Sequence, residues 1–340
     1  MAEKISMRSL AAEAGVSPAA VSRYINGNGY VSEEKKAQIA AAIKKLNYRL
    51  PERRRVKSPH HGTLAIILPP GVGNSYFKEI ALRFAQSAQL QGFAAVDHTM
   101  VAENLLKTLR HCSAAGADGI FVPAFPDMYL SAELLHFVEN SRVPIVFLNE
   151  FLEPYPTINS ITIDNTACMK QATEELIRHG SRRLAYLGPP IGINKSSALR
   201  SRGFLEACRQ AGIPPEDSLV AEGDFFQHDH FSECGYTAAQ RAFAKNPQLD
   251  GLAVWTDNIA TGVLWYLYER RLHIPEDVRV ITMNDELSGL LCPPLTTMDL
   301  PVAQIAQEAV ELLARMQDPV ERMITRQITL QPRLIRRGSV

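Results

Sequence analysis

The sequence predicts a two-part chain: a small all-α segment at the N-terminus, followed by a larger α/β body that contains two doubly wound parallel sheets. Three observations support this prediction. The chain has 340 residues, which is too many for one ordinary domain. Residues 1–57 contain 12 Lys and Arg against 5 Asp and Glu, a net charge of +7 in a chain that is neutral overall. From residue 62 onward, short apolar runs alternate with stretches of helical length.

The overall composition is that of an ordinary globular protein, with 46% apolar and 21% charged residues. Its five cysteines lie far apart and include no CxxC pair, which favours reduced thiols over a disulfide framework. The N-terminus lacks the apolar core of a secretion signal, and no apolar run reaches the length of about 18 residues that a membrane span requires. We therefore expect a cytoplasmic protein without a membrane contact.

Helix start and stop signals divide the first fifty residues into three short helices. Each helix is preceded by a serine that can serve as its N-cap: Ser6, Ser17 and Ser32. Gly15 follows the first helix at a position suited to a left-handed stop. Two helices joined at a glycine, with a third packed behind them, form a helix-turn-helix unit. A plain three-helix domain is the alternative, and the excess of basic residues favours DNA binding.

In the body, strand-like apolar runs lie at residues 64–68, 117–122, 145–148, 184–187, 252–255 and 278–283. Helical stretches between them lie at residues 79–91, 166–179, 197–211 and 259–271. Strands separated by helices indicate parallel α/β sheets, and two such sets indicate two lobes. In open sheets of this kind ligands bind beyond the carboxyl ends of the strands. The region between the two lobes is therefore the expected ligand site.

Several motifs resemble the LacI/GalR family of repressors. They are LAAEAGVS at residues 10–17, VSRYING at 21–27, YVS at 30–32, LNY at 46–48 and PPLTT at 293–297. The resemblance implies a helix-turn-helix headpiece over residues 1–48, a basic hinge or linker over 49–61 and a periplasmic-binding-protein-like effector domain over 62–340. The N-lobe would contain about 62–162 and 292–325, and the C-lobe about 163–291 and 326–340.

The resemblance also implies a function. The protein would be a sequence-specific transcriptional repressor that binds operator double-stranded DNA as a homodimer and responds to a small metabolite, a sugar or a sugar acid. A solute-binding protein without a DNA role is the alternative, but it would carry a secretion signal and no headpiece. No dinucleotide fingerprint, phosphate-binding loop, nucleophile elbow or convincing metal-ligand set is found in the sequence. We therefore expect neither an enzyme nor a cofactor.

By the same resemblance, the helix that begins at Ser17 lies in the major groove of the operator. Its first positions, Pro18, Ala19 and Ala20, would face the base edges with apolar contacts only. Arg23 is then the expected reader of a base, with a phosphate contact as the alternative. Five further residues would contact the DNA phosphates, through a hydroxyl or amide side chain or through the N–H groups at a helix N-terminus. They are Ser17, Ser22, Asn26, Tyr30 and Ser32.

The linker departs from the family pattern. After LNY the family has a proline and then a hinge helix with Ala-Arg-x-Leu, whereas this chain has its proline late, at Pro51, and lacks that element. Three consecutive basic residues, Arg53, Arg54 and Arg55, stand in its place. They can follow phosphates or enter a narrow minor groove, or the segment can be a solvated tether.

Carried over position by position, the effector site would contain Tyr76, Phe77, Asn149, Asp164, Arg200, Phe225, Thr256, Asp257 and Asn284. Aromatic faces stack on sugar rings and arginine binds carboxylates, although each aromatic ring can also be core and Arg200 can be a surface charge. Asn149 and Asn284 stand where many sugar-binding members have aspartate. With fewer carboxylates near Arg200, a sugar acid or sugar phosphate is favoured over a neutral sugar.

Overall fold

The computed structural model describes residues 11–17, 20–21, 35, 38–39, 41–42, 45, 62–68, 75–100, 105–123, 131–148, 157–192, 195–224 and 231–340. The chain divides into two compact units, residues 1–61 and residues 62–340. Within the described ranges, no helix has both the length and the apolar character needed to cross a bilayer.

In the first unit, the described residues include the end of one helix and the start of the next. Gly15 has a φ of 64°, and its N–H donates to the carbonyl of Ala12, so it ends the first helix as predicted. The hydroxyl of Ser17 accepts a hydrogen bond of 3.2 Å from the N–H of Ala20, which confirms the predicted N-cap. An ion pair of 2.6 Å joins Lys45 to Glu13.

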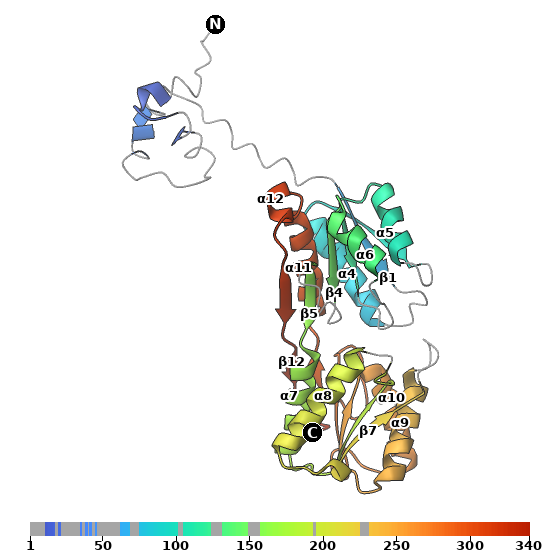
Figure 1. Ribbon diagram of the computed structural model, residues 1–340. Coiled ribbons are helices and arrows are strands. Elements are labelled where there is room, and N and C mark those ends of the chain that lie inside the picture. Colours follow the sequence, from blue (N-terminus) through green and yellow to red (C-terminus); the bar gives the residue numbers. More distant parts are fainter. Residues whose placement is uncertain are drawn as a thin grey trace. The chain divides into compact units, whose positions relative to one another are not determined.

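The first sheet of the body has the strand order β11-β5-β4-β3-β1-β2, and all of its pairs are parallel. Its strands are β1 (Thr63–Leu68), β2 (Ala94–Thr99), β3 (Gly119–Val122), β4 (Ile145–Leu148), β5 (Ser160–Ile163) and β11 (Gln327–Leu330). The associated helices are α4 (Ser75–Leu90), α5 (Leu105–Ala114), α6 (Ala132–Asn140), α11 (Val302–Arg315) and α12 (Pro319–Arg322). Figure 1 shows this lobe in cyan to green, with α11 and β11 in red.

Alternation along β1 shows why this sheet is covered on both faces. Leu64 and Ile66 belong to the core formed with α4 and α11, whereas Ala65 and Ile67 belong to the core formed with α5 and α6. Because successive side chains of a strand point to opposite faces, a continuous apolar run supplies both cores. The lobe is therefore doubly wound, as predicted.

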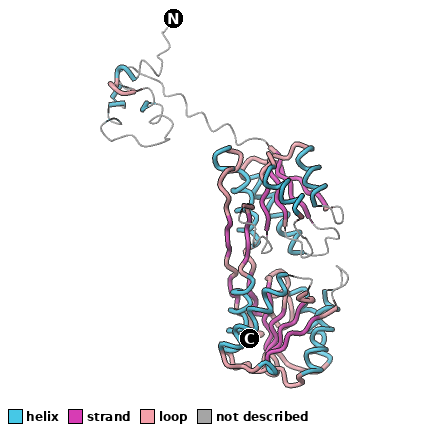
Figure 2. Tube along the Cα trace, viewed as in Figure 1, coloured by secondary structure: helices cyan, strands magenta, loops and turns pink. Residues whose placement is uncertain are grey.

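The second sheet has the order β12-β10-β9-β8-β6-β7, with only β12 antiparallel. Its strands are β6 (Leu184–Gly188), β7 (Ser218–Glu222), β8 (Gly251–Val254), β9 (Arg279–Met283), β10 (Thr296–Asp299) and β12 (Arg333–Ile335). The helices are α7 (Asn165–Arg178), α8 (Lys195–Gln210), α9 (Phe231–Lys245) and α10 (Asp257–Glu269), with a 3-10 turn, η2, at Pro215–Asp217. Figure 2 shows the strands of the body in two separate sets.

Three short connections join the two lobes. β5 ends at Ile163 and α7 begins at Asn165; β10 ends at Asp299 and α11 begins at Val302; β11 ends at Leu330 and β12 begins at Arg333. Each connection leaves a parallel strand at its carboxyl end and enters the other lobe at once. The carboxyl ends of the parallel strands in each sheet therefore face the other lobe (Figure 1).

The lobe boundaries differ from the expected ones at two places. The chain passes between lobes at residues 300–301 and 331–332, not near 291 and 325, because β10 pairs with β9 in the second sheet and β11 pairs with β5 in the first. The short segments TTMD and QITL carry no periodicity that indicates which sheet they join.

The C-terminal residues are tied to α7 through Glu175, whose side chain is 1% exposed. The Nε atom of Arg336 donates to its Oε1 at 2.6 Å and Nη2 donates to its Oε2 at 3.2 Å, and Arg178 also bonds this carboxylate. Hydrogen bonding from Arg336 lowers the pKa of Glu175, more than offsetting the opposing effect of burial. The ionised form of Glu175 therefore stabilises the second lobe.

Replacing Glu175 with glutamine is expected to lower the free energy of unfolding at pH 7 by about 2 kcal/mol, the usual contribution of a hydrogen bond to a charged group. Because the pKa of Glu175 is lowered on folding, its contribution is complete above the ordinary glutamate value of about 4.3 and is lost as the pH falls below that value. Urea denaturation at pH 7 and in mild acid measures both effects. The same substitution at the neighbouring Glu174 is the control, and equal losses in the two variants would contradict this role.

Candidate functional site

Arg200, in the first half of α8, is the central charged side chain at the carboxyl edge of the second sheet. It is 5% exposed. Its Nε donates to Oδ1 of Asn165 at 2.6 Å, and its Nη1 donates to the carbonyl of Trp255 at 2.7 Å. The guanidinium carbon lies 5.4 Å from the centroid of the Trp255 ring, within the range of a cation–π contact. Arg200 thus joins α7, α8 and the end of β8, and the alternative that it is only a surface charge is wrong.

The guanidinium of Arg200 has N–H groups that make no hydrogen bond to the described residues. Among the described residues, only its Nε and Nη1 donate hydrogen bonds, and both acceptors are neutral groups. A buried cation without an anionic partner favours the binding of an anion, because burial weakens the solvation that would otherwise compete. This side chain can therefore bind a carboxylate or phosphate group through Nη2.

Asp164 and Asn165 lie at the crossing from the first lobe to the second. The side chain of Asp164 accepts a 2.8 Å hydrogen bond from the N–H of Ala167 and so caps α7, while remaining exposed. Asn165 is buried, and it holds Arg200. Asp164 is one of the residues predicted from the sequence, whereas Asn165 is not. The signal was present, because a polar residue that opens a helix directly after a buried strand lies at the edge where ligands bind.

Thr256 and Asp257 follow β8 and have different environments. The hydroxyl oxygen of Thr256 is buried and has no hydrogen-bond partner among the described residues. Asp257 is fully buried, and its two oxygens accept hydrogen bonds from the N–H groups of Asn258, at 2.9 Å, and Leu287, at 2.7 Å. Burial raises the pKa of Asp257, and these N–H groups oppose that rise. In this structure the carboxylate of Asp257 fixes the backbone after β9 and offers no exposed surface to a ligand.

Asn284, the residue after β9, is 5% exposed and has a φ of 72°. Asparagine tolerates this left-handed backbone conformation better than most residues. Its N–H donates to the carbonyl of Met298 at 2.9 Å, and its carbonyl accepts from the hydroxyls of Ser288 at 2.9 Å and Thr297 at 2.6 Å. The backbone of Asn284 is therefore fixed at both polar groups.

In the first lobe, Tyr76 and Phe77 lie in the first turn of α4. Their rings meet edge to face with centroids 5.4 Å apart. Both are half-buried and pack against the core that α4 and α11 cover. The two aromatic residues therefore contribute to the core and keep part of their surface exposed.

The remaining predicted residues have different outcomes. Ala20, expected to face DNA, is 9% exposed and belongs to the buried apolar residues of the first unit. This expectation is corrected, because a small apolar side chain is readily buried inside a compact unit. Ser17 is exposed. The other predicted positions lie outside the described residues; they are Pro18, Ala19, Ser22, Arg23, Asn26, Tyr30, Ser32, Arg53, Arg54, Arg55, Asn149 and Phe225.

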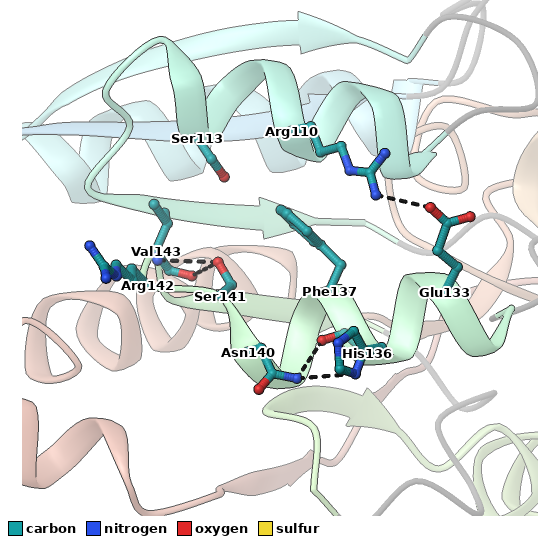
Figure 3. Close-up of a pocket in the computed structure, with 9 residues that line it drawn as sticks. All are labelled: Arg110, Ser113, Glu133, His136, Phe137, Asn140, Ser141, Arg142 and Val143. Atoms are coloured by element: carbon teal, nitrogen blue, oxygen red, sulfur yellow. Dashed lines mark hydrogen bonds and ion pairs between the residues drawn. The ribbon is translucent and has the colours of Figure 1, made fainter.

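A surface hollow of about 460 Å³ between α5 and α6 was not predicted (Figure 3). Arg110 lies over the ring of Phe137 and pairs with Glu133 at 2.9 Å, and the side chain of Asn140 donates to the carbonyl of His136. The lining reaches Val143, just before β4, so the hollow lies toward the amino ends of the strands. It is therefore separate from the carboxyl edge that carries Arg200. In the part of the chain that the structure describes, no three His, Cys, Asp or Glu residues are grouped to hold a metal ion.

Comparison with known proteins gives two family matches. Residues 6–50 match bacterial regulatory proteins of the lacI family, and residues 173–340 match the periplasmic binding protein-like domain. The ribose operon repressor of Bacillus subtilis is 30% identical over 313 residues, which are 90% of each chain. Catabolite control protein A of Priestia megaterium is 26% identical and covers 92% of each chain.

Solved structures share the fold. The transcriptional regulator CelR in complex with cellobiose has a TM-score of 0.70 at 24% identity and covers 99% of this chain and all of its own. The Lac repressor bound to ONPG has a TM-score of 0.70 at 22% identity, with the same coverage. The predicted combination of a helix-turn-helix segment and two parallel-sheet lobes is confirmed.

Proposed function

Because this chain belongs to the lacI family of bacterial regulatory proteins, we propose that a sugar-type effector, bound between the carboxyl edges of its two sheets, controls its affinity for operator DNA. The chain is a DNA-binding transcriptional regulator and not an enzyme. The family match over residues 6–50 excludes a solute-binding protein without a DNA role.

The buried guanidinium of Arg200 is the observation that carries this proposal. Its Nη2 has no hydrogen-bond partner among the described residues, and its Nε and Nη1 have neutral partners at Asn165 and Trp255. The nearby carboxylate of Asp257 is already bound to backbone N–H groups, and Asn284 contributes an uncharged amide side chain. This arrangement favours an acidic sugar, such as an aldonate, a uronate or a sugar phosphate, over a neutral one.

Calorimetric titration of the full chain tests the proposal with ribose, cellobiose, gluconate, glucuronate and ribose 5-phosphate. An acidic sugar is expected to bind at least about tenfold more tightly than ribose or cellobiose, and raising the salt concentration is expected to weaken its binding. If a neutral sugar binds tightly and none of the three acidic sugars binds, the proposed charge preference is wrong. Failure of every sugar to bind would contradict this assignment of the effector class.

The two lobes can change their arrangement at the three short connections that join them, residues 163–165, 299–302 and 330–333. An effector that contacts both carboxyl edges binds one arrangement of the lobes better than others, and it therefore shifts the population toward that arrangement. The same shift changes how the DNA-binding segments of a dimer match two operator half-sites. Operator affinity thus responds to effector concentration.

A second copy of the chain is the proposed partner for two exposed apolar surfaces. In the first lobe, Leu82 and Leu90 of α4 are 56% and 89% exposed, beside the edge strand β2. In the second lobe, Trp265 and Tyr268 of α10 are 53% and 82% exposed. Exposed apolar side chains of this size are typical of protein–protein contacts, and helix-turn-helix proteins read paired half-sites as dimers.

Replacing Tyr268 with aspartate is expected to weaken the dimer by at least about tenfold, because a charge would be buried at the contact while the fold of the monomer is untouched. Sedimentation velocity over a dilution series measures the change. Leu205→Asp is the matched control: Leu205 is 42% exposed on α8, away from both surfaces. An unchanged dimer in the Tyr268 variant, or equal dissociation in both variants, would contradict the assignment.

Arg23→Ala is expected to relax base preference at one operator position, with a loss of about 1–3 kcal/mol on the preferred base and little loss on the others. Arg23 itself lies outside the described residues. A mobility-shift series with single base changes in the operator, and with an unrelated duplex as control, measures this preference. An equal loss on every duplex would instead identify Arg23 as a phosphate contact.

A further inference from the structure

The segment between β9 and β10, residues 284–295, is here called the 284–295 loop. It begins with Asn284, and its first half is held by Asp257, the first residue of α10, and by a hydrogen bond within the loop. Asp257 accepts from the N–H of Leu287 at 2.7 Å, and the fully buried Ser288 donates its hydroxyl to the carbonyl of Asn284 at 2.9 Å. These contacts fix the first half of the loop against the N-terminus of α10.

The loop is also held by one arginine near the C-terminus. Nη1 of Arg337 lies 2.6 Å from Oδ1 of Asp285, and Nη2 donates to Oδ2 at 2.8 Å. Nη1 also donates to the carbonyl of Leu295 at 2.9 Å. A single planar guanidinium therefore joins the second and the last residue of the 284–295 loop, which a point charge such as an ammonium group cannot do with the same geometry.

This ion pair is better shielded than its neighbour. The side chains of Arg337 and Asp285 are 21% and 20% exposed, whereas Arg333, which pairs with Asp299 at 3.3 Å, is 77% exposed. Shielding from solvent strengthens the attraction between two close charges. The Arg337–Asp285 contact is therefore the stronger of the two constraints that this part of the chain places on the carboxyl edge.

The residues around Arg337 are anchored independently of the loop. Arg336 binds the buried Glu175. Two residues beyond Arg337, the hydroxyl of Ser339 donates to the carbonyl of Val280 at 2.6 Å and accepts from the N–H of Thr296 at 2.8 Å. Arg337 is thus presented from a backbone that is already fixed to β9 and β10, so the ion pair transmits that fixed position to the loop.

We propose that Arg337 is a positioning residue for effector binding: through Asp285 it sets the position of the 284–295 loop, and with it the orientation of Asn284 at the carboxyl edge. This role rests on the proposed effector site. Arg337 acts through Asp285 and touches no effector itself.

Hydrogen–deuterium exchange of the full chain tests the positioning directly, without any effector. Arg337→Gln and Asp285→Asn are each expected to speed exchange in peptides covering the 284–295 loop by about tenfold, while peptides covering β8 keep their wild-type rates. Arg337→Lys is expected to lie between wild type and Arg337→Gln. The double variant is expected to match the single variants, because both remove the same contact.

Arg333→Gln is the matched control, because it removes an arginine of the same C-terminal segment that pairs with Asp299 and not with the loop. It is expected to leave exchange in the loop unchanged. Loop exchange within about twofold of wild type in Arg337→Gln would overturn the proposal. Equal acceleration in the loop and in β8 would also overturn it, since that result indicates general destabilisation.

The titrations with ribose, cellobiose, gluconate, glucuronate and ribose 5-phosphate provide a second readout. For any of these that binds the wild-type protein, Arg337→Gln is expected to raise Kd by about tenfold and to leave operator affinity without effector unchanged. An unchanged Kd would overturn the positioning role. If none of the five sugars binds, the proposed effector class fails, whereas the exchange comparison still decides whether Arg337 holds the loop.

Discussion

Replacing Arg200 with methionine is expected to abolish the effector response and to lower the free energy of unfolding by about 3 kcal/mol. Methionine fills a similar volume, but it leaves Oδ1 of Asn165 and the carbonyl of Trp255 without their donor in a buried environment. The loss of the cation also removes the contact over the Trp255 ring. Urea denaturation and calorimetry with the sugar that binds best measure the two losses separately.

Arg202→Met provides the control for this experiment, because Arg202 lies on the same helix and is exposed. It is expected to change stability by less than about 0.5 kcal/mol and to leave effector binding intact. Arg200→Lys is expected to recover part of the stability, since an ammonium group keeps the charge but not the planar fork. Wild-type effector affinity in Arg200→Met would show that the ligand does not contact this guanidinium.

Substituting alanine for Gly262 is expected to cost about 3 kcal/mol, near the upper end for an added methyl group in a packed core. A Cβ atom at Gly262 of α10 would lie 1.7 Å from the carbonyl oxygen of Ser232 in α9. The contact is reciprocal, because a Cβ atom at Gly235 of α9 would lie 1.9 Å from the carbonyl oxygen of Ile259. Both obstacles are backbone atoms, so relief requires the two helices to move apart.

Urea denaturation of Gly262→Ala measures this cost, with Gly192→Ala as the control. A Cβ atom at Gly192 would have no heavy atom within 4 Å, and its backbone does not adopt a positive φ in the left-handed range. The control is expected to change stability by less than about 0.5 kcal/mol. Similar stability in the Gly262 and Gly192 variants would show that α9 and α10 tolerate wider separation than the structure indicates.

The buried strands could be predicted from the sequence, and the strands at the sheet edges could not. The apolar runs at 64–68, 145–148 and 184–187 correspond to β1, β4 and β6, because a strand covered on both faces is apolar throughout. β2 reads AAVDHT and is largely exposed at the edge of its sheet, so it has no such run. Edge strands and crossings are decided by pairing with distant residues, which local periodicity does not contain.

The same limit applies to the site. The family resemblance places Arg200 among the residues that end the strands, and its hydrogen bond to the carbonyl of Trp255, directly after β8, agrees with that placement. The sequence could not show that the carboxylate of Asp257 binds the N–H of Leu287, thirty residues further along the chain. Nor could it foresee that Ala20 is buried, since a small apolar residue suits both a helix crossing and a DNA surface.

The interleaved connections have a consequence for how the protein is made. When a ribosome has released the chain only as far as residue 300, the sheet built from β1 to β5 still lacks both α11 and β11. On one face of this sheet, the core that contains Phe84 and Phe121 then lacks its covering helix α11. The second sheet still lacks its edge strand β12. Neither half of the sensor matures before the last forty residues appear. A product terminated near residue 300 is therefore expected to expose apolar surface of the body to chaperones and proteases.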